Sequence, residues 1–434
     1  MSKRIRVFMV TMLAVALSLT FMPAAHADPA TPEAYSEAAI TKVLRVPVGT
    51  AVPTTNFTFN FTPVSVNSDT SLASTMPPIG TSGVVTIPFT PTTSFTHTET
   101  VGDVDFYYLE SAPLLGTINW PDTGIYEYTI SENAGTYTGT DTMTYSDAQY
   151  TMRVHVREYK TGDIIPPGKA VGNLYIFAIG VVRIVEEGGD PGTDKVDPTP
   201  GSLSTLYDYS QVTFTNTFTK NNGDPDDPDP INNRTLGVSK TTSGHYASSS
   251  AYFDFTMTVT KPSLVASATY HAYIIDTNGA IINGSALADN NVTAAGVDIN
   301  GNSYIAFGSG AQTTFSLKSG QTLAFTNTHV GASYIISEAG SAGYTPSAII
   351  TSNGIAAPAV TAAEGASLAI PVASAAAPLV GEAANSADFT NTNDGMSETG
   401  INMNNLPYYL LFALALIALG GFVAFKVRKR SVEN

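Results

Sequence analysis

A lysine, a glutamate and an asparagine recur in the same order in two separate segments of the chain. The two sets are Lys42, Glu132 and Asn216, then Lys240, Glu338 and Asn391. A neutral lysine amine can attack the side-chain carboxamide of asparagine, which forms an isopeptide bond and releases ammonia. A neutral glutamic acid beside the pair can polarise the amide carbonyl and shuttle the protons. The residue types therefore predict two internal cross-links, with lysine as nucleophile, asparagine as electrophile and glutamate as acid/base.

The reaction requires a dry core, and the alternation of side chains predicts one. Residues two apart in a strand share a face, and Lys42 shares its face with Ile40 and Leu44. The other five polar residues also stand in phase with apolar ones. Their rows are Tyr126, Tyr128, Ile130 and Glu132; Val212, Phe214, Asn216 and Phe218; Leu236, Val238 and Lys240; Tyr334, Ile336 and Glu338; and Phe389 and Asn391. Burial lowers the pKa of a lysine and raises that of a glutamate, so it favours the neutral, reactive forms.

Each residue taken alone has a simpler interpretation. Lys42 could be a solvent-facing lysine that protects an edge strand from aggregation. Glu132 and Glu338 could lie in solvated turns, because Asn133 and Gly340 are close by, and Asn216 could lie in a loop. Two complete sets in the same order and phase favour the covalent interpretation, since the exported part of the chain has only eight lysines. Each set would react once with itself, so the chain is not expected to be an enzyme with turnover.

The segments that must position these residues are predicted to be strands. Clean alternation of apolar residues marks positions 56–62, 150–156 and 253–259. The continuous apolar run 174–185 predicts a central strand, and the Gly-, Pro- and Asp-rich stretch 186–202 predicts a surface loop of the kind that is often functional. The alanine-rich piece 356–384 leaves helix, loop and weak strand open. With only 13% charged residues and abundant Thr, Ser, Gly and Pro, the composition is typical of all-β sandwiches.

The chain divides into segments of different composition. In order, these are a signal peptide over 1–27, a first β-sandwich over 38–218, a linker over 219–233, a second β-sandwich over 234–393, a polar spacer over 394–405, a transmembrane helix over 406–425 and a basic cytoplasmic tail over 426–434. The linker is placed where repeated Asp-Pro pairs cannot build a core, and it is predicted to be stiff and extended.

Both ends of the chain are predicted to be targeting devices. The N-terminus has three basic residues, a short apolar run and Ala-His-Ala, which predict an exported protein cut before Asp28. An uncleaved N-terminal anchor is the alternative. Near the other end, twenty apolar residues are long enough to cross a bilayer, and the Lys- and Arg-rich residues after them are expected to stay in the cytoplasm.

The charge and composition of the chain argue against several classes of partner and ligand. Residues 28–399 hold 35 acidic and 13 basic residues, a net charge of about −22. Such a surface argues against binding to nucleic acid or docking on anionic membranes. The chain has no cysteine, and its six histidines are scattered without metal-ligand spacing, so neither a metal nor a cofactor is expected.

These features together resemble the streptococcal-type pilin isopeptide-linkage domains found in backbone pilins of Gram-positive bacteria. The resemblance rests on the two lysines, on the segments YTISEN and YIISEA, on VTFTNTF and DFTNTN, and on the tail. It implies tandem immunoglobulin-like sandwiches of the collagen-adhesin B-domain type, with self-formed Lys–Asn bonds assisted by a Glu. The six polar residues match that pattern one by one.

The tail resembles a sortase sorting signal. Its motif is Met396, Ser397, Glu398, Thr399 and Gly400, which departs from the common Leu-Pro-x-Thr-Gly at the Leu and the Pro. The resemblance implies cleavage after Thr399 and transfer of its carboxyl group to an amine. A simple C-terminal membrane anchor is the alternative. The acceptor amine implied for a pilus shaft is a lysine in the first domain, for which Lys195 is the leading candidate and Lys169 and Lys160 compete.

The sequence thus predicts a structural pilus subunit on a cell surface, with a membrane-anchored precursor. The implied partners are a sortase, other pilin subunits and peptidoglycan. The alternatives are a monomeric wall- or membrane-anchored adhesin built from the same domains, and a membrane-tethered binding protein that sortase does not process.

Overall fold

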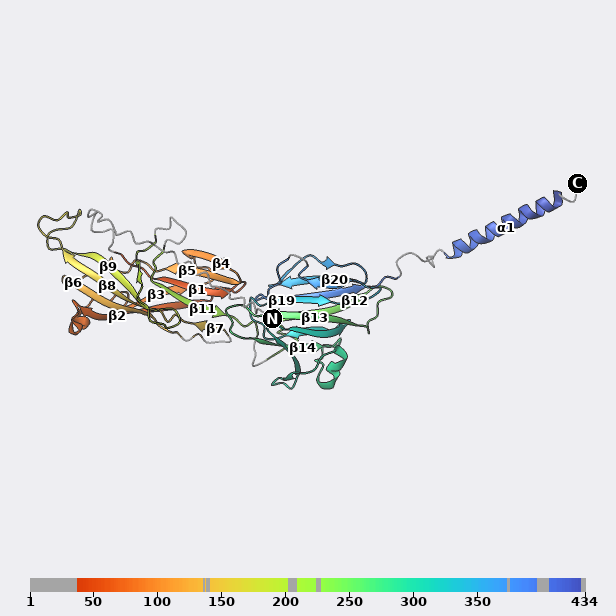
Figure 1. Cartoon of the computed structure of the whole chain (residues 1–434), viewed down its shortest axis with the longest axis horizontal. Coiled ribbons are helices and arrows are strands. Elements are labelled where there is room, and N and C mark those ends of the chain that lie inside the picture. The colour runs from red at the N-terminus through yellow and green to blue at the C-terminus, as the bar shows by residue number, and fades with distance from the viewer. Residues whose placement is uncertain are drawn as a thin grey trace, which may run out of the picture.

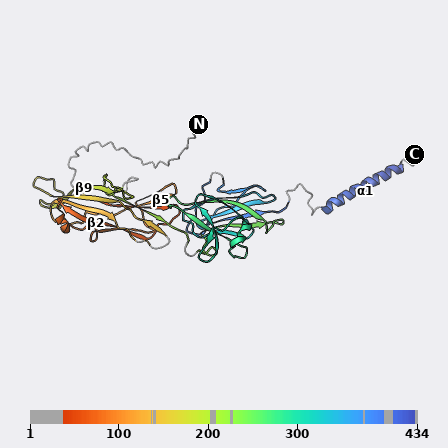
Figure 2. The ribbon, with the colours of Figure 1, turned by 60° about the horizontal axis from the view of Figure 1, so that its bottom comes forward.

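The computed structural model describes residues 37–135, 137, 141–201, 209–223, 228–372, 375–395 and 406–430. These residues form β-strands, two short 3-10 helices, η2 (Thr70–Thr75) and η3 (Gly284–Asn290), and one α-helix, α1 (Leu406–Arg430). The strands build two bodies that lie end to end, and two views of the molecule agree on this arrangement (Figures 1 and 2). The predicted all-β fold class, with a C-terminal apolar helix, is confirmed.

The first body consists of two facing sheets. One sheet has the order β4 (His97–Val101), β5 (Val104–Glu110), β1 (Thr41–Pro47), β11 (Thr213–Thr219) and β7 (Thr142–Thr144). The other has the order β10 (Lys195–Val196), β9 (Leu174–Val185), β8 (Gln149–Glu158), β6 (Gly124–Glu132), β2 (Thr55–Val66) and β3 (Val84–Phe89). Alternate apolar side chains of both sheets fill the space between them, among them Leu44, Phe59, Tyr128 and Phe214.

The second body repeats this plan with more strands. Its larger sheet has the order β15 (Gly296–Val297), β16 (Ser303–Gly308), β14 (Thr269–Ile275), β18 (Thr322–Phe325), β12 (Leu236–Ser243), β24 (Ser386–Thr392), β20 (Thr345–Ser352) and β21 (Ile355–Ala356), and β22 (Val360–Thr361) also pairs with β20. The smaller sheet has the order β17 (Gln312–Lys318), β13 (Tyr252–Thr260), β19 (Ser333–Glu338) and β23 (Leu368–Ile370). A separate apolar core lies between them.

In each body the first strand pairs in parallel with the last. Strand β1 pairs with β11 in the first body, and β12 pairs with β24 in the second. Each of these four strands has neighbours on both sides, so none is a sheet edge. The start and the end of each body are therefore adjacent in space and run in the same direction.

Strand β9 corrects one expectation. Its bounds, Leu174–Val185, are those of the predicted strand, but it lies next to the short edge strand β10 rather than at the centre of the sheet. Only Ile176 and Val181 of β9 are buried. An apolar run records the tendency to form a strand, whereas the position of that strand in the sheet depends on which neighbours the topology supplies.

The junction between the two bodies is held by polar contacts. Lys220 Nζ lies 2.7 Å from an Oε atom of Glu382, and the other Oε of Glu382 accepts a hydrogen bond from Ala51 N–H at 2.7 Å. On another side, Asp103 accepts bonds from the N–H and the hydroxyl of Ser263, both at 2.7 Å. Lys220, near the start of the predicted linker 219–233, is thus bonded to the second body. The predicted domain limits stay a prediction.

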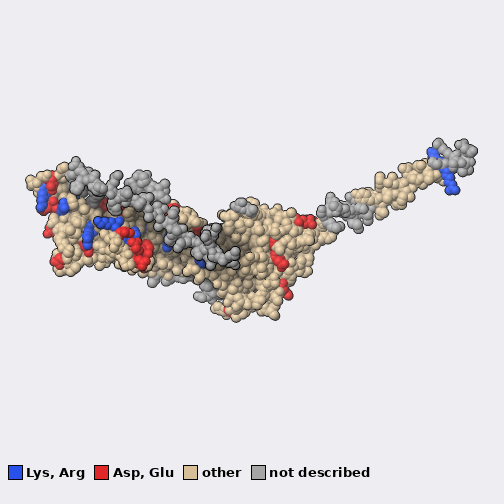
Figure 3. Space-filling view, in the orientation of Figure 1, with Lys and Arg blue, Asp and Glu red and all other residues tan. Residues whose placement is uncertain are grey.

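The helix α1 stands apart from both bodies. Its residues Tyr408–Lys426 have a mean hydropathy of 2.2 and none of them is buried, which suits a membrane span by length and composition. In Figure 3 the helix surface is free of charge along its length, and basic side chains appear at its far end. The predicted signal peptide lies outside the described residues.

Candidate cross-linking sites

The strand register places each lysine diagonally opposite its asparagine. Lys42 pairs with Phe214 while Asn216 pairs with Leu44, so the lysine and the asparagine are two residues apart on neighbouring parallel strands. Residues two apart share a face, and here it is the face that looks into the core. The second body repeats the offset, because β12 and β24 pair Lys240 with Phe389, two residues before Asn391.

Each glutamate reaches the site from the opposite sheet. Glu132 ends β6 and pairs with Phe59 of β2, and Glu338 ends β19 and pairs with Phe255 of β13. The carboxylates therefore cross the core to meet a lysine and an asparagine that the facing sheet presents. The interpretation of the glutamates as turn residues is wrong, since the side chains of Glu132 and Glu338 are 0% and 1% exposed.

In the first body the glutamate carboxylate accepts hydrogen bonds from both the lysine and the asparagine. Lys42 Nζ donates to Glu132 Oε2 at 2.9 Å, and Asn216 Nδ2 donates to Glu132 Oε1 at 2.9 Å. The carbonyl oxygen of Asn216, Oδ1, accepts the backbone N–H of Ser146 at 2.8 Å. Lys42 and Asn216 are both fully buried. Lys42 is therefore not an edge-strand lysine, because it is enclosed and its strand has two neighbours.

In the second body the bonds from the lysine and from the asparagine converge on one oxygen of the glutamate. Lys240 Nζ donates to Glu338 Oε1 at 2.6 Å, and Asn391 Nδ2 donates to that oxygen at 2.7 Å. Within the described residues, Glu338 Oε2 and Asn391 Oδ1 are buried without a hydrogen-bond partner. Unsatisfied buried oxygens are costly, and a proton on Oε2 would remove part of that cost.

Burial lowers the pKa values of both lysines and so favours their neutral form. Desolvation lowers the pKa of Lys42 from 10.5 to about 8, although Glu132 opposes the shift by its charge and its hydrogen bond, and Glu187 opposes it more weakly. Desolvation likewise lowers the pKa of Lys240 to about 8, against the opposing effect of Glu338. Burial also raises the pKa of Glu338, which favours its protonated form. Amine and acid are thus both shifted toward their uncharged states.

Aromatic rings enclose both amines. Lys42 Nζ lies 4.6 Å from the ring centroid of Phe57, and Lys240 Nζ lies 4.3 Å from that of Phe253. The next aromatic residue along each strand, Phe59 or Phe255, lies at 5.9 Å. These rings exclude water from the reacting groups, so the same local chemistry is built twice.

The two asparagine side chains are oriented so that the glutamates cannot play the whole of their expected role. Both carboxylates face the NH₂ group of the asparagine rather than its carbonyl oxygen. Glu132 and Glu338 are therefore placed to exchange protons with the leaving nitrogen, and neither touches the oxygen that was expected to be polarised. In the first body that oxygen is bound by Ser146, which sequence reasoning missed because a backbone N–H leaves no mark in the residue pattern.

The remaining predicted residues are not part of these sites. Lys195 is exposed on the edge strand β10, and Lys160 and Lys169 are exposed in the chain between β8 and β9. The sorting motif, Met396 to Gly400, lies outside the described residues.

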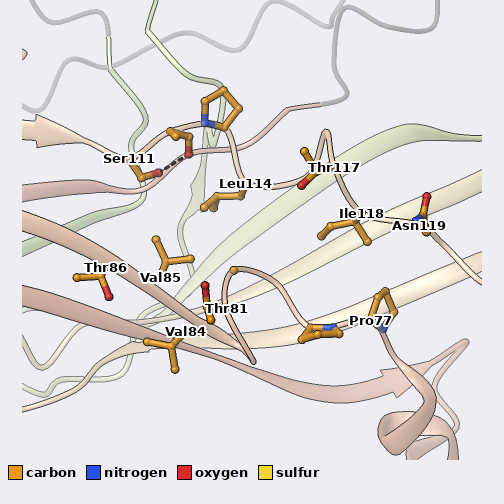
Figure 4. Close-up of a pocket in the computed structure, with 14 residues that line it drawn as sticks. Pro77, Thr81, Val84, Val85, Thr86, Ser111, Leu114, Thr117, Ile118 and Asn119 are labelled. Atoms are coloured by element: carbon orange, nitrogen blue, oxygen red, sulfur yellow. Dashed lines mark hydrogen bonds between the residues drawn. The ribbon is translucent and has the colours of Figure 1, made fainter.

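The first body also has an open groove of about 900 Å³ beside β3. It is lined by small, apolar and hydroxyl side chains, and several of them, such as Val85, Leu114 and Ile118, point into the space (Figure 4). None of the lining residues is charged or aromatic, so the groove offers no acid, base or stacking surface.

Comparison with known proteins gives matches for both bodies. Residues 38–219 match the family described as the Spy0128-like isopeptide containing domain, and residues 234–368 match a domain of unknown function, DUF7601. The first match confirms, for the first body, the resemblance to pilin isopeptide domains. The chain matches none of the curated proteins with which it was compared.

Solved structures with similarity to the chain include pilus proteins. The major pilin from Streptococcus pyogenes is 15% identical, with a TM-score of 0.29 over 83% of this chain and 99% of that one. The major pilin T3.2 from a Streptococcus pyogenes serotype is 17% identical, with a TM-score of 0.29 over 83% and 99%. A pilus-presented adhesin, Spy0125 (Cpa), is 13% identical, with a TM-score of 0.22 over 57% and 36%.

Proposed function

We propose that this chain, whose first body matches the family described as the Spy0128-like isopeptide containing domain, is a pilus subunit of a Gram-positive cell surface that is stiffened by two internal Lys–Asn bonds. The observation that carries the proposal is the repeated geometry. Both bodies place a buried lysine and an asparagine two residues out of register on parallel strands, with a carboxylate from the facing sheet within 2.9 Å of each partner.

The proposed reaction balances without a co-reactant. The neutral amine of Lys42 adds to Cγ of Asn216, the C–N bond to Nδ2 breaks, and ammonia leaves as the new amide forms. The proton that the amine loses passes through Glu132 to the departing nitrogen, because this carboxylate bonds both nitrogens. Lys240, Asn391 and Glu338 repeat these roles in the second body. The fixed geometry replaces a bimolecular encounter, which supplies a high effective concentration.

The product ties the first strand of each body to its last. A pull on the two ends of a body would then pass through the new bond instead of separating the sheets. Treated as a cross-link that closes a loop of well over a hundred residues, each bond would stabilise its body by about 5 kcal/mol through the entropy of the unfolded chain.

Assembly is proposed to use the tail and an exposed lysine. A sortase would cleave between Thr399 and Gly400, release the membrane span Tyr408–Lys426 and join the Thr399 carboxyl group to an amine. Within a shaft that amine would be Lys195 of the next subunit, because it is exposed on an edge strand of the first body. At the base of the shaft it would belong to peptidoglycan.

Mass spectrometry of the full chain tests the cross-links. Each bond removes one ammonia, so the expected mass lies about 34 Da below that of the unmodified chain after signal removal. Proteolytic digests should contain two branched peptides, one joining Lys42 to Asn216 and one joining Lys240 to Asn391. A full unmodified mass, with only linear peptides in the digest, would remove the basis of the proposal.

A monomeric adhesin is the second candidate, and the groove beside β3 is the feature that favours it. The two functions differ in their products on the cell wall. A shaft subunit gives ladders of multimers that resist boiling in detergent, whereas an adhesin gives a single wall-linked species.

A further inference from the structure

One group in the first site has no counterpart among the described residues of the second. The backbone N–H of Ser146, in the chain between β7 and β8, donates to Asn216 Oδ1 at 2.8 Å. A weaker contact of the same N–H reaches Glu132 Oε2 at 3.2 Å. Ser146 is buried, so the contact with Oδ1 is shielded from water. This donor also fixes the amide orientation, because Oδ1 must face the N–H while Nδ2 faces the carboxylate.

The position of Ser146 is held by a carboxylate outside the core. The Ser146 hydroxyl lies 2.9 Å from both Oε atoms of Glu187, to which it donates. The backbone N–H of Thr215, the residue before Asn216, donates to Glu187 Oε1 at 2.7 Å. Glu187 therefore ties the chain that carries the N–H to the strand that carries the asparagine. It lies in an exposed turn after β9, so it is not part of the packed core.

We propose that the Ser146 N–H is the oxyanion donor for cross-linking in the first body, and that Glu187 is the positioning residue that aims it. The inference rests on the proposed cross-linking reaction. When Lys42 Nζ bonds to Cγ of Asn216, the carbonyl π pair moves onto Oδ1, which becomes an oxyanion. A backbone N–H already aligned with that oxygen stabilises the developing charge without reorganisation. The pair returns as ammonia leaves.

The second body lacks this device among its described residues, since Asn391 Oδ1 has no donor there. Its tetrahedral intermediate is less stabilised, so the bond between Lys240 and Asn391 is expected to form more slowly than that between Lys42 and Asn216. In both sites the lysine and the asparagine bond one buried glutamate, which makes the second site an internal reference for the first.

Glu187 has a second effect of opposite sign. Its negative charge raises the pKa of Lys42 and so disfavours the neutral amine. Removing the charge would speed the reaction if this effect dominated, and would slow it if positioning dominated. The sign of the change in rate therefore separates the two.

The test follows both bonds in the same molecules. Full chain recovered unfolded from inclusion bodies, before either bond has formed, is diluted from denaturant into native buffer. The reaction is stopped at intervals, and digests are analysed for the two branched peptides. Glu187→Gln removes the charge, Ser146→Ala keeps the N–H but removes the hydroxyl anchor, and Glu186→Gln is the matched control, because Glu186 bonds Arg183 instead. Resistance to brief proteolysis before digestion checks that each variant has folded.

For Glu187→Gln and for Ser146→Ala, the initial rate at which the Lys42–Asn216 bond forms should fall by about tenfold or more. This decrease is smaller than the one expected from removing an oxyanion donor completely, because both variants keep the N–H and lose only its alignment. The double variant should be no slower than the slower single variant. The rate of the Lys240–Asn391 bond, and both rates in Glu186→Gln, should match the wild type. Across a pH series the maximal rate should fall in both variants. The midpoint set by Lys42 should stay in place in Ser146→Ala and move to lower pH in Glu187→Gln, because that variant loses the charge that raises the pKa of Lys42.

Rates at or above the wild-type value in folded Glu187→Gln and Ser146→Ala would overturn the inference, while the continued appearance of both branched peptides would leave the proposed function intact. The absence of both peptides from the wild type would instead contradict the proposed function itself.

Discussion

Lys42 and Asn216 lie diagonally on neighbouring parallel strands, and Lys240 and Asn391 repeat that offset with the same spacing of two residues. A parallel pair of strands requires a long connection, and here the connection is the rest of the body. The two side chains can meet only after nearly the whole body has folded. Cross-linking is therefore expected to follow folding rather than direct it.

Glu338→Gln should abolish the bond in the second body without unfolding it. Glutamine keeps the volume and accepts a hydrogen bond from Lys240, but it cannot exchange a proton with the leaving nitrogen. The intact mass should rise by about 16 Da relative to the wild type, because ammonia is retained and the substitution itself removes about 1 Da. Calorimetry should show a lower melting temperature for the second body. Glu364→Gln, at an exposed position, is the control. Retention of the Lys240–Asn391 peptide in Glu338→Gln would contradict the assigned role.

Glu132→Ala should destabilise the first body beyond the loss of its cross-link. The reference is Asn216→Ala, which prevents the bond but keeps the contact between Lys42 and Glu132. Removing the carboxylate leaves a buried amine unpaired, which costs about 3–5 kcal/mol. Denaturant titration measures the difference between the two variants. Adding Lys42→Met to Glu132→Ala should recover most of the loss, and a failure to do so would show that the pair is not the cause.

The rate of bond formation in the second body should have a maximum in pH. The reactive state holds a neutral Lys240 and a protonated Glu338, which together carry one titrating proton. Above about pH 8 that proton is lost and the acid is gone, since the pKa of Lys240 is about 8. Below the raised pKa of Glu338 the pair carries two protons and the amine is charged. Refolding the full chain across a pH series, with quantification of branched peptide, should therefore show a fall on both sides, and a steady rise beyond pH 9 would contradict the assignment.

Polymerisation should depend on the tail and on one lysine. Thr399→Ala should keep the membrane span on the protein and abolish wall-linked material in the native host. Lys195→Ala should abolish ladders of multimers but leave single wall-linked subunits, because only the acceptor amine between subunits is lost. Lys169→Ala is the matched control, since Lys169 is also an exposed lysine of the first body. Ladders that persist in Lys195→Ala and vanish in Lys169→Ala would reassign the acceptor.

Glu382→Ala should loosen the junction and leave both cross-links unchanged. Glu382 contacts both Lys220 and the Ala51 N–H. These contacts are partly exposed, so each contributes only about 1 kcal/mol or less. Small-angle scattering should show a broader distribution of shapes, and proteases should cut sooner in the segment 219–233. An unchanged scattering profile would show that Asp103 and Ser263 suffice to hold the junction.

The sequence predicts the two triads because their signal is periodic and repeated. Lys42 and Glu132 stand in phase with apolar residues, and the same phase recurs around Lys240 and Glu338. A charged side chain on the apolar face of a strand is stable only if a polar partner meets it in the core. The pattern therefore strongly predicts that the lysine and the glutamate lie in contact. The fold class follows from the same alternation of side chains.

Other features leave no such signal. Ser146 acts through its backbone, which every residue but proline possesses. Glu187 follows another glutamate and precedes two glycines, so it resembles a solvated loop charge, although the stretch 186–202 as a whole is predicted to be a surface loop of the kind that is often functional. The order of strands around β9 depends on contacts far apart in sequence, which local apolarity does not encode.

The parallel pairing of first and last strands has a further consequence once the bonds exist. Once the Lys42–Asn216 and Lys240–Asn391 bonds have closed the two bodies, only the roughly two dozen residues from Asn216 to Lys240 remain extensible between the two cross-links. Fully drawn out, that stretch adds at most about 80 Å. The ion pair between Lys220 and Glu382 must break before this stretch can lengthen. Under a sudden load the ion pair would therefore break first, and it would form again when the load falls.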